Sequence, residues 1–411
     1  MLLYWLWLTT RRGLAKHRYP AVLECFGSPE EAYYAEHEVY RLAGFSAQEI
    51  QTLCDKSLEL PRQILAACTR KNIHILTYQD ASYPDRLRSI PDPPAVLYYL
   101  GNLPDFDREA AIAIIGSRKS TPYGLTHAKR FGFQVAICGG LVVSGMAAGG
   151  DSAAMEGALT AGRPTVGVLG CGVDIVYPKQ NQHLYEDVCR WGCILTEYPP
   201  GTPPYKQNFP ERNRIISGLT RGVLVIEAGA RSGTQITVNQ ALDQGRDVYV
   251  LPVNIGLEAS AGNIRLLKEG AAAVESGWDV LSNYQEDYPD RVKWNRLGEA
   301  ASLAPHELQP LHEQPQMLVA EKPVSYRTDD RKVVDNSENK AYIDVQAILA
   351  QQPEDEQAIL RQLLNGEMHP DELVARTGLS VSRVLMAMTQ LELKGYVVRQ
   401  AGNRYALAMR G

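Results

Sequence analysis

Several features are scarce in this sequence of 411 residues, and each scarcity excludes a class of protein. No apolar run reaches the ~20 residues that a membrane-spanning helix needs. The apolar segment 1–10 has no basic region before it and no small-residue cleavage site after it, so we expect a first core helix and no membrane contact. Lys and Arg number 42 against 47 Asp and Glu, which disfavours a protein that coats nucleic acid with its whole surface but leaves room for one basic groove.

Cysteine is also sparse, with seven residues scattered along the chain. Cys189 and Cys193 come closest to a metal-ligand pair, but no second Cys or His pair follows to complete a zinc site. We therefore expect buried thiols in a reducing cytoplasm, with no metal and no cofactor.

The nucleotide-binding motifs of common enzymes are missing as well. A dinucleotide site needs Gly-x-Gly-x-x-Gly after the first strand, whereas the first turn here is Gly116-Ser117-Arg118. Gly170 and Gly172 match only the first two glycines of that motif, and no Gly-x-x-x-x-Gly-Lys-Ser/Thr loop occurs. A nicotinamide-dependent or ATP-dependent enzyme is therefore disfavoured.

What is present divides the chain into three regions and a linker. Residues 1–105 hold short amphipathic runs and many tyrosines, which predicts an N-terminal helical domain. Residues 106–284 alternate apolar runs with helical segments, a pattern typical of an α/β fold with a doubly wound parallel sheet covered on both faces. Residues 285–353 are rich in Gln, Glu, Pro, Asp and Asn, as expected of a polar flexible linker, and residues 354–411 have the helix–helix–turn–helix–hairpin order of a winged helix. The expected strands of the α/β domain are 111–115, 141–143, 165–169, 193–195, 223–226 and 247–251, and the expected helices are 124–137, 152–161, 183–191, 236–244 and 264–269.

Turns rich in Gly and Ser follow several of these strands. The carboxyl ends of parallel strands meet at one edge of a sheet, where backbone N–H groups and helix N-termini favour anions. One such turn would be explained by tight turning alone, but four at one edge with basic residues between them predict a site for a polyanion or nucleotide. The basic residues are Arg118, Lys119, Lys206, Arg212, Arg214 and Arg231.

Phe209 is an aromatic residue between basic residues, in a segment that we interpret as a loop because Pro residues lie on both sides. A nucleic-acid base stacked on such a ring contributes ~1–3 kcal/mol. Alone, the ring would be better explained as a core or loop-anchoring residue, but with basic residues on both sides the two interpretations are about even and both stay open.

Five segments resemble the DNA-processing protein A (DprA/Smf) family: Gly116-Ser117-Arg118, Ser144-Gly145, Phe209 to Leu219, Glu227-Ala228 and Arg231-Ser232-Gly233. The resemblance runs from about residue 112 to 273, and the helical and winged-helix-like flanks match the longer members. It implies an extended Rossmann-like fold with an N-terminal domain of the SAM or helix-hairpin-helix type. It also implies a non-catalytic homodimer that binds and protects incoming single-stranded DNA and loads the RecA recombinase during natural transformation and recombination.

By motif position, the resemblance implies that Arg118 and Lys206 contact backbone phosphate and that Phe209 packs on a base. Arg212 and Arg214 match the motif but would also suit a structural role, pairing with acidic neighbours such as Glu211 or Glu227. The implied DNA-binding residues, several of which would line a positive pocket through N–H and hydroxyl groups, are Gly116, Ser117, Arg118, Ser144, Gly145, Lys206, Phe209, Arg212, Asn213, Arg214, Ser232 and Gly233.

The sequence departs from the family pattern beside this pocket. Where the family usually shows Arg, Ile and His, this chain has Ala148, Gly150 and Met155. Losing one cation there would remove about one phosphate contact and flatten the salt dependence of binding. The N-terminal region lacks the Gly-x-Gly hairpin that meets phosphate, so we expect it to have a structural or protein-contact role.

The winged helix offers few base-reading side chains. The segment 354–411 has seven basic and seven acidic residues, and its expected recognition helix shows only Arg383 and Gln390 as obvious candidates. We expect protein contact or weak duplex binding there rather than recognition of a specific operator.

Two other functions compete with this interpretation. The Gly-rich architecture also resembles nucleotide phosphoribohydrolases of the lysine-decarboxylase-like (LOG) group, but no carboxylate follows Gly233-Thr234 within a turn to act as general acid. The other alternative is a transcriptional regulator in which the winged helix reads DNA and the α/β domain senses a small phosphate ligand.

Overall fold

The computed structural model describes residues 1–11, 13–230, 232–294, 353–363, 368–393, 397–400 and 404–407. The chain divides into two compact units, 1–320 and 321–411, which we describe separately. Most of the expected linker 285–353 and the side chain of Arg231 lie outside the described residues. The linker's first residues contact the first unit, because the Lys293 N–H donates to the Cys138 carbonyl (2.9 Å) and the Trp294 ring lies 6.0 Å from the Trp278 ring.

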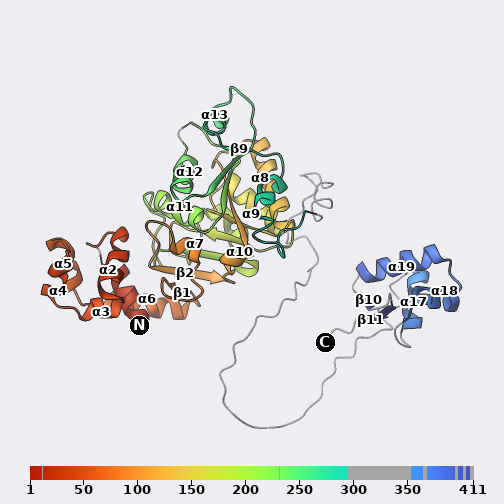
Figure 1. Ribbon diagram of the computed structural model, residues 1–411, viewed down its shortest axis with the longest axis horizontal. Helices are drawn as coiled ribbons and strands as arrows, with labels where there is room; N and C mark the ends of the chain where they lie inside the picture. The colour runs from red at the N-terminus through yellow and green to blue at the C-terminus, as the bar shows by residue number, and fades with distance from the viewer. Residues whose placement is uncertain are drawn as a thin grey trace, which may run out of the picture. The chain divides into compact units, whose positions relative to one another are not determined.

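A nine-stranded sheet forms the centre of the first unit (Figure 1). Its order is β1-β2-β6-β5-β4-β3-β7-β8-β9, with β1 and β2 antiparallel at one edge and every pair from β6 to β9 parallel. Each expected strand of the α/β domain coincides with one of β3 to β8, so the predicted parallel sheet is confirmed. The strands are β1 (His74–Thr77), β2 (Val96–Gly101), β3 (Ala110–Ile115), β4 (Gly140–Ser144), β5 (Thr165–Val168), β6 (Cys193–Thr196), β7 (Gly222–Val225), β8 (Asp247–Val250) and β9 (Ala272–Ala273).

Helices cover both faces of this sheet, which is why its central strand is apolar throughout. All residues of β3 are buried, and they alternate between two cores. Ile112 and Ile114 lie in the core formed with α8 (Pro122–Ile137), α9 (Gly150–Thr160) and α14 (Gly277–Leu281). Ala111, Ala113 and Ile115 lie in the core shared with α11 (Asn208–Gly218), α12 (Thr234–Asp243) and α13 (Ala261–Lys268). Helix α10 (Gln182–Trp191) packs beside α9 and contributes to the core of the N-terminal helices.

Helix α11 corrects the sequence interpretation, which treated the segment around Phe209 as a loop. The helix begins at Asn208, so Pro210 lies in its first turn, where backbone N–H groups have no intrahelical partner and proline is tolerated. Phe209 therefore projects from a rigid element that crosses from β6 to β7.

The N-terminal residues form a cluster of short helices around an aromatic core. Trp5, Leu6, Trp7 and Leu8 of the first helix are fully buried or nearly so, which confirms the expected core helix. Within the described residues, no helix is both long enough and apolar enough to cross a membrane. The helices are α1 (Leu2–Thr9), α2 (Tyr19–Phe26), α3 (Pro29–Tyr34), α4 (His37–Leu42), α5 (Ala47–Cys54), α6 (Glu59–Arg70) and α7 (Asp85–Arg88).

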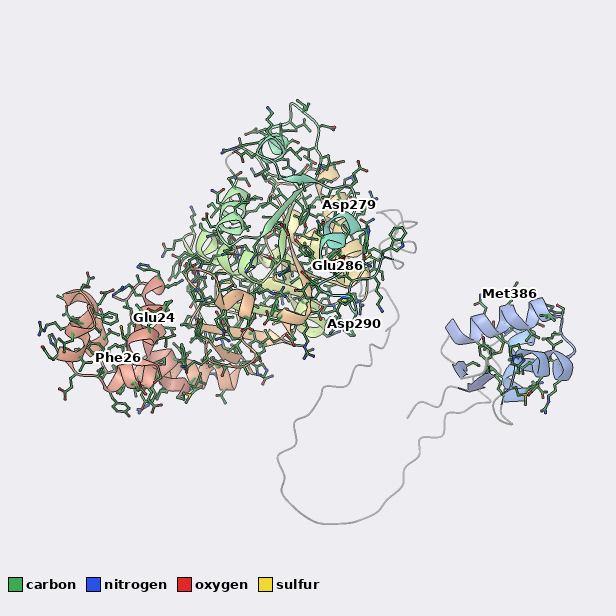
Figure 2. The ribbon with its side chains drawn as sticks, viewed as in Figure 1. Glu24, Phe26, Asp279, Glu286, Asp290 and Met386 are labelled. Atoms are coloured by element: carbon green, nitrogen blue, oxygen red, sulfur yellow. The ribbon has the colours of Figure 1, made fainter. Side chains whose placement is uncertain are left out.

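The second unit has the predicted winged-helix order. Val384, Met388 and Leu391 of its longest helix are buried in a core of its own. Met386 is 68% exposed and lies on the outer side of that helix (Figure 2). The elements are α17 (Glu354–Leu363), α18 (Pro370–Thr377), α19 (Val381–Leu393), β10 (Val397–Gln400) and β11 (Arg404–Leu407).

Candidate nucleic-acid interface

The loops that follow β3, β4 and β7 meet at the carboxyl edge of the sheet, beside the point where the strand order reverses. The Ser117 N–H donates to the Glu227 carbonyl (2.8 Å), and the Gly150 N–H donates to the Ser117 carbonyl (3.2 Å). Gly149 has a φ of +91°, and a Cβ there would lie 2.3 Å from the Ser117 oxygen, so only glycine allows the two loops to approach so closely. This is the ligand-binding edge of open α/β sheets.

Asp151 occupies the inner end of this edge. Its side chain accepts hydrogen bonds from the N–H groups of Gly116 (3.1 Å) and Gly145 (3.2 Å), two donors that we predicted for a bound phosphate. The hydroxyl of Ser144 is fully buried and donates to the Ile114 carbonyl (2.6 Å). These three predicted pocket residues are therefore engaged by the protein itself, and their N–H and hydroxyl groups do not line an open pocket.

Glu227 plays the same role at the start of α8. Its carboxylate accepts hydrogen bonds from the N–H (2.7 Å) and hydroxyl (2.6 Å) of Thr121, and the residue is 1% exposed. A buried carboxylate thus satisfies the positive end of this helix. The carboxylates of Asp151 and Glu227 thus occupy the backbone N–H groups at this edge. The groups that can contact a ligand are therefore the exposed side chains around the edge, which we call the rim.

Phe209 and Arg118 come together at that rim from segments far apart in the sequence. The Arg118 guanidinium lies over the Phe209 ring, 5.4 Å from its centroid, and Arg118 is exposed while Phe209 is half-buried. The Tyr177 ring packs against Phe209 at 5.3 Å, and the absence of a side chain at Gly170 makes room for the ring's other edge. A cation above an aromatic ring can hold a phosphate beside a stacked base.

Lys206 stands three residues before Phe209 and is exposed, as is its neighbour Tyr205, with 53% exposure. Lys119 is exposed beside Arg118. Sequence reasoning missed Tyr177 and Tyr205. The position of Tyr205 next to Lys206 was a usable signal, whereas Tyr177 joins the interface only through the fold.

Arg212 is buried beneath the interface, with 4% exposure. Its guanidinium donates to the carbonyl oxygens of Gly145 (2.7 Å) and Val168. Burial lowers the pKa of Arg212 and raises that of Asp151, and the attraction between the two side chains opposes both shifts. The structure therefore gives Arg212 internal partners rather than a surface for DNA.

Arg214 is also buried and pairs with two carboxylates, Glu197 (2.7 Å) and Asp92 (2.8 Å). Although burial alone would lower the pKa of Arg214, these ion pairs raise it. Its partners are neither Glu211 nor Glu227, the two that we had considered.

The remaining predicted residues lie around the same edge with modest roles. Asn213 is half-buried and accepts a hydrogen bond from Arg212 (3.2 Å). The Ser232 hydroxyl bonds to Thr234 (2.9 Å) at the start of α12, and Gly233 is exposed with open space around it.

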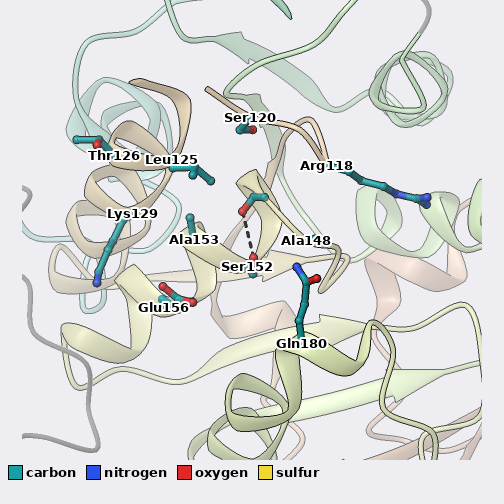
Figure 3. Close-up of a pocket in the computed structure, with 11 residues that line it drawn as sticks. Arg118, Ser120, Leu125, Thr126, Lys129, Ala148, Ser152, Ala153, Glu156 and Gln180 are labelled. Carbon is teal, nitrogen blue, oxygen red and sulfur yellow. Dashed lines mark hydrogen bonds between the residues drawn. The ribbon is translucent and has the colours of Figure 1, made fainter. Parts of the chain in front are cut away.

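A pocket of about 470 Å³ opens on the other side of Arg118, between α8 and α9 (Figure 3). Lys129 enters it from α8, and Gln180 closes one side. Its lining residues are Arg118, Ser120, Leu125, Thr126, Lys129, Ala148, Gly149, Ser152, Ala153, Glu156 and Gln180.

The geometry gives little support to the two competing functions. The first turn of α12, where a phosphoribohydrolase of the LOG group would carry its acid, contains no acidic residue. In the winged helix, Arg383 of α19 forms an ion pair with Asp355 of α17 (2.5 Å), so its charge is already compensated within the domain.

Comparisons with known proteins agree with this architecture. The family model described as DNA recombination-mediator protein A matches residues 74–285, and the DprA winged helix domain matches 346–403. Protein Smf of Synechocystis sp. is 32% identical over 413 residues, covering 98% of each chain, and the DNA processing protein DprA of Streptococcus pneumoniae is 41% identical over 208 residues, which cover 50% of this chain and 72% of that protein. The X-ray structure of the Streptococcus pneumoniae protein superposes with a TM-score of 0.60 and 34% identity, over 69% of this chain and 98% of that one. The chain belongs to the DprA/Smf family of DNA-processing proteins.

Proposed function

We propose that this protein binds single-stranded DNA along the rim formed by Arg118, Phe209 and Lys206. Arg118 and Lys206 contact backbone phosphates, and Phe209 stacks on one base. The observation that carries the proposal is the exposed Arg118 guanidinium held over the half-buried Phe209 ring at the ligand-binding edge of the sheet.

The charge distribution supports a local rather than a global DNA surface. The whole chain has a net charge of -5, yet two carboxylates at this edge, Asp151 and Glu227, are buried and hydrogen-bonded to backbone. The exposed rim is therefore left to Arg118, Lys119 and Lys206, whose local field governs encounter with a polyanion.

Membership of the family supports the finer parts of the proposal. The protein acts without catalysis, as a homodimer, and passes bound single strands to a RecA-type recombinase during transformation and recombination. A cytoplasmic location fits its seven free cysteines, since exposed thiols such as Cys25 and Cys54 persist in a reducing compartment. Arg212 and Arg214 position α11 from within rather than contacting DNA.

Retardation of oligo-dT at two salt concentrations tests the binding proposal. Arg118→Ala and Lys206→Ala should each weaken binding and lower the salt slope by about 0.7, because each removes one phosphate contact. Phe209→Ala should weaken binding by ~1–3 kcal/mol through lost stacking and leave the slope unchanged.

A remote charge removal, Lys268→Ala at the end of α13, serves as the matched control and should leave binding unchanged. The proposal fails if the wild-type protein does not bind oligo-dT, or if the three rim variants bind it as tightly as the wild type. An equal loss of slope in all three would indicate misfolding instead, which circular dichroism of each variant would reveal.

A further inference from the structure

The pocket between α8 and α9 is continuous with the proposed DNA rim through Arg118. This residue lies over the Phe209 ring on one side and lines the pocket on the other. Figure 3 shows its side chain extending away from the centre of the pocket, with Lys129 on the opposite side of the residues that line it. A strand whose phosphate is held by Arg118 would therefore have its next nucleotide at the pocket mouth.

The walls of the pocket suit a base better than a second phosphate. Leu125, Ala148 and Ala153 provide apolar surface, and Thr126 and Gln180 add polar groups around it. Small-molecule sites typically combine apolar walls with a few convergent polar groups in ~300–1,000 Å³, and the 470 Å³ of this cavity lie within that range.

Charge distinguishes the two ends of the cavity. Among the described residues that line it, Glu156 alone is acidic, and it lies near Lys129, so this end is close to neutral. Arg118, at the other end, has no carboxylate within ion-pair distance among the described residues. A phosphate is thus favoured at the Arg118 rim, and an uncharged base is favoured deeper in the cavity.

The serine hydroxyls add a further constraint on the occupant. Ser120 donates to the Ser117 carbonyl (2.9 Å) and Ser152 donates to the Gly149 carbonyl (3.1 Å), so both offer only their oxygen lone pairs to a ligand. Hydroxyl oxygens with free lone pairs accept hydrogen bonds from base N–H groups.

We propose that the α8–α9 pocket binds the base of the nucleotide next to the one stacked on Phe209, with the phosphate between the two held by Arg118. This inference rests on the proposed function and adds a second base site to it. The small side chain of Ala148 keeps the pocket mouth open.

Filling the pocket without changing its charge tests this proposal. Ala148 is half-exposed and its backbone lies outside the left-handed region, so Ala148→Leu should fold normally. We expect Ala148→Leu to bind oligo-dT about fivefold or more weakly than the wild type, since one base loses its site. The wild type and Ala148→Leu should bind an oligonucleotide of abasic sites equally, because that strand has no base to place in the pocket.

Lys129→Ala gives a second, independent readout. It should leave the salt slope on oligo-dT unchanged, as Lys268→Ala does, because the neutral end of the pocket holds no phosphate. A slope lower by about 0.7 would place a phosphate there and reject the base site. If Ala148→Leu binds oligo-dT like the wild type, the pocket proposal is overturned, and Arg118→Ala and Phe209→Ala still report on the rim. If Ala148→Leu weakens the abasic strand as much as oligo-dT, the added side chain disturbs the backbone path, and the base site is likewise rejected. Failure of the wild-type protein to bind either strand would instead reject the proposed function itself.

Discussion

Asp151 and Arg212 are buried beneath the interface, and the charge of each is stabilised by the other. Gly145 lies between them, and a Cβ there would be 2.7 Å from both the Arg212 guanidinium and the Asp151 carboxylate. Removing one member of a buried charge pair leaves the other without compensation in a low-dielectric surrounding. The glycine, the acid and the arginine are therefore one structural unit.

Replacing Arg212 should consequently affect folding before it affects DNA. Arg212→Met leaves the buried Asp151 carboxylate without its cation, and the carbonyls of Gly145 and Val168 lose their donors. We expect the free energy of unfolding to fall by about 3–5 kcal/mol, measured by urea denaturation. Arg118→Ala, which removes an exposed side chain, should change it by only about 0.5 kcal/mol.

The double variant Asp151→Asn/Arg212→Met provides the check, because it removes both charges and should recover part of the lost stability. If Arg212→Met were as stable as the wild type but bound DNA poorly, Arg212 would be a DNA contact and its structural role would be wrong.

At the scale of elements, helix α11 carries the aromatic ring and also joins the α/β domain to the N-terminal helices. Lys16, in the turn before α2, forms ion pairs with Glu211 of α11 (2.7 Å) and with Glu197 after β6 (3.0 Å). Tyr198 donates a hydrogen bond to the same Glu211 carboxylate (3.2 Å), and the Lys16 ammonium lies 4.5 Å from the centroid of its ring. The N-terminal region therefore supports the helix that presents Phe209.

The Lys16 link should show a defined pH dependence. Burial would raise the pKa of Glu211, but its contacts with Lys16 and Tyr198 outweigh this and lower it below the ordinary 4.5. A lowered carboxyl pKa gives stability that is present above 4.5 and is lost as the pH falls through the lower folded value. Lys16→Met should thus be less stable than the wild type at pH 7, by about 1 kcal/mol, and the difference should shrink below pH 4.5.

Lys119→Met removes an exposed cation from the same unit and should show neither effect. A Lys16→Met deficit that stayed constant down to pH 3 would mean that Glu211 is not its partner. Thermal unfolding across the pH range measures both variants.

Helix α11 also shows where sequence patterns fail. Its buried side is made by Ile215 and Ile216 together with Arg212 and Arg214, so the charged residues hide the helical periodicity that apolar residues would display. In β3 to β8 most of the buried residues are apolar, and the strands were predictable from them. The interface was predictable where exposed cations and Phe209 carry the signal, but not where Asp151 takes the backbone donors, because only the fold brings Gly116, Gly145 and Asp151 together.

At the scale of the whole molecule, the two units have separate cores. The core of the winged helix consists of residues between 359 and 405, and the three cores of the first unit use none of them. All the residues that we propose to contact DNA lie between 116 and 209, within the first unit. The winged helix was readable from the sequence because its core residues form a separate stretch of apolar periodicity.

A chain that ends after residue 294 should therefore retain single-stranded DNA binding. It keeps every rim residue and the contacts of Lys293 and Trp294 with the α/β domain, so we expect its affinity for oligo-dT to match that of the full chain within about twofold. Its salt slope should also be unchanged, because the cation that α19 offers, Arg383, is already paired with Asp355 in the full chain. Fluorescence anisotropy with labelled oligo-dT and with a duplex of the same length measures both quantities. A loss of tenfold or more, about 1.4 kcal/mol, on oligo-dT would show that the winged helix holds part of the strand. A loss confined to the duplex would assign the winged helix to double-stranded DNA, leaving the rim around Phe209 as the single-strand site.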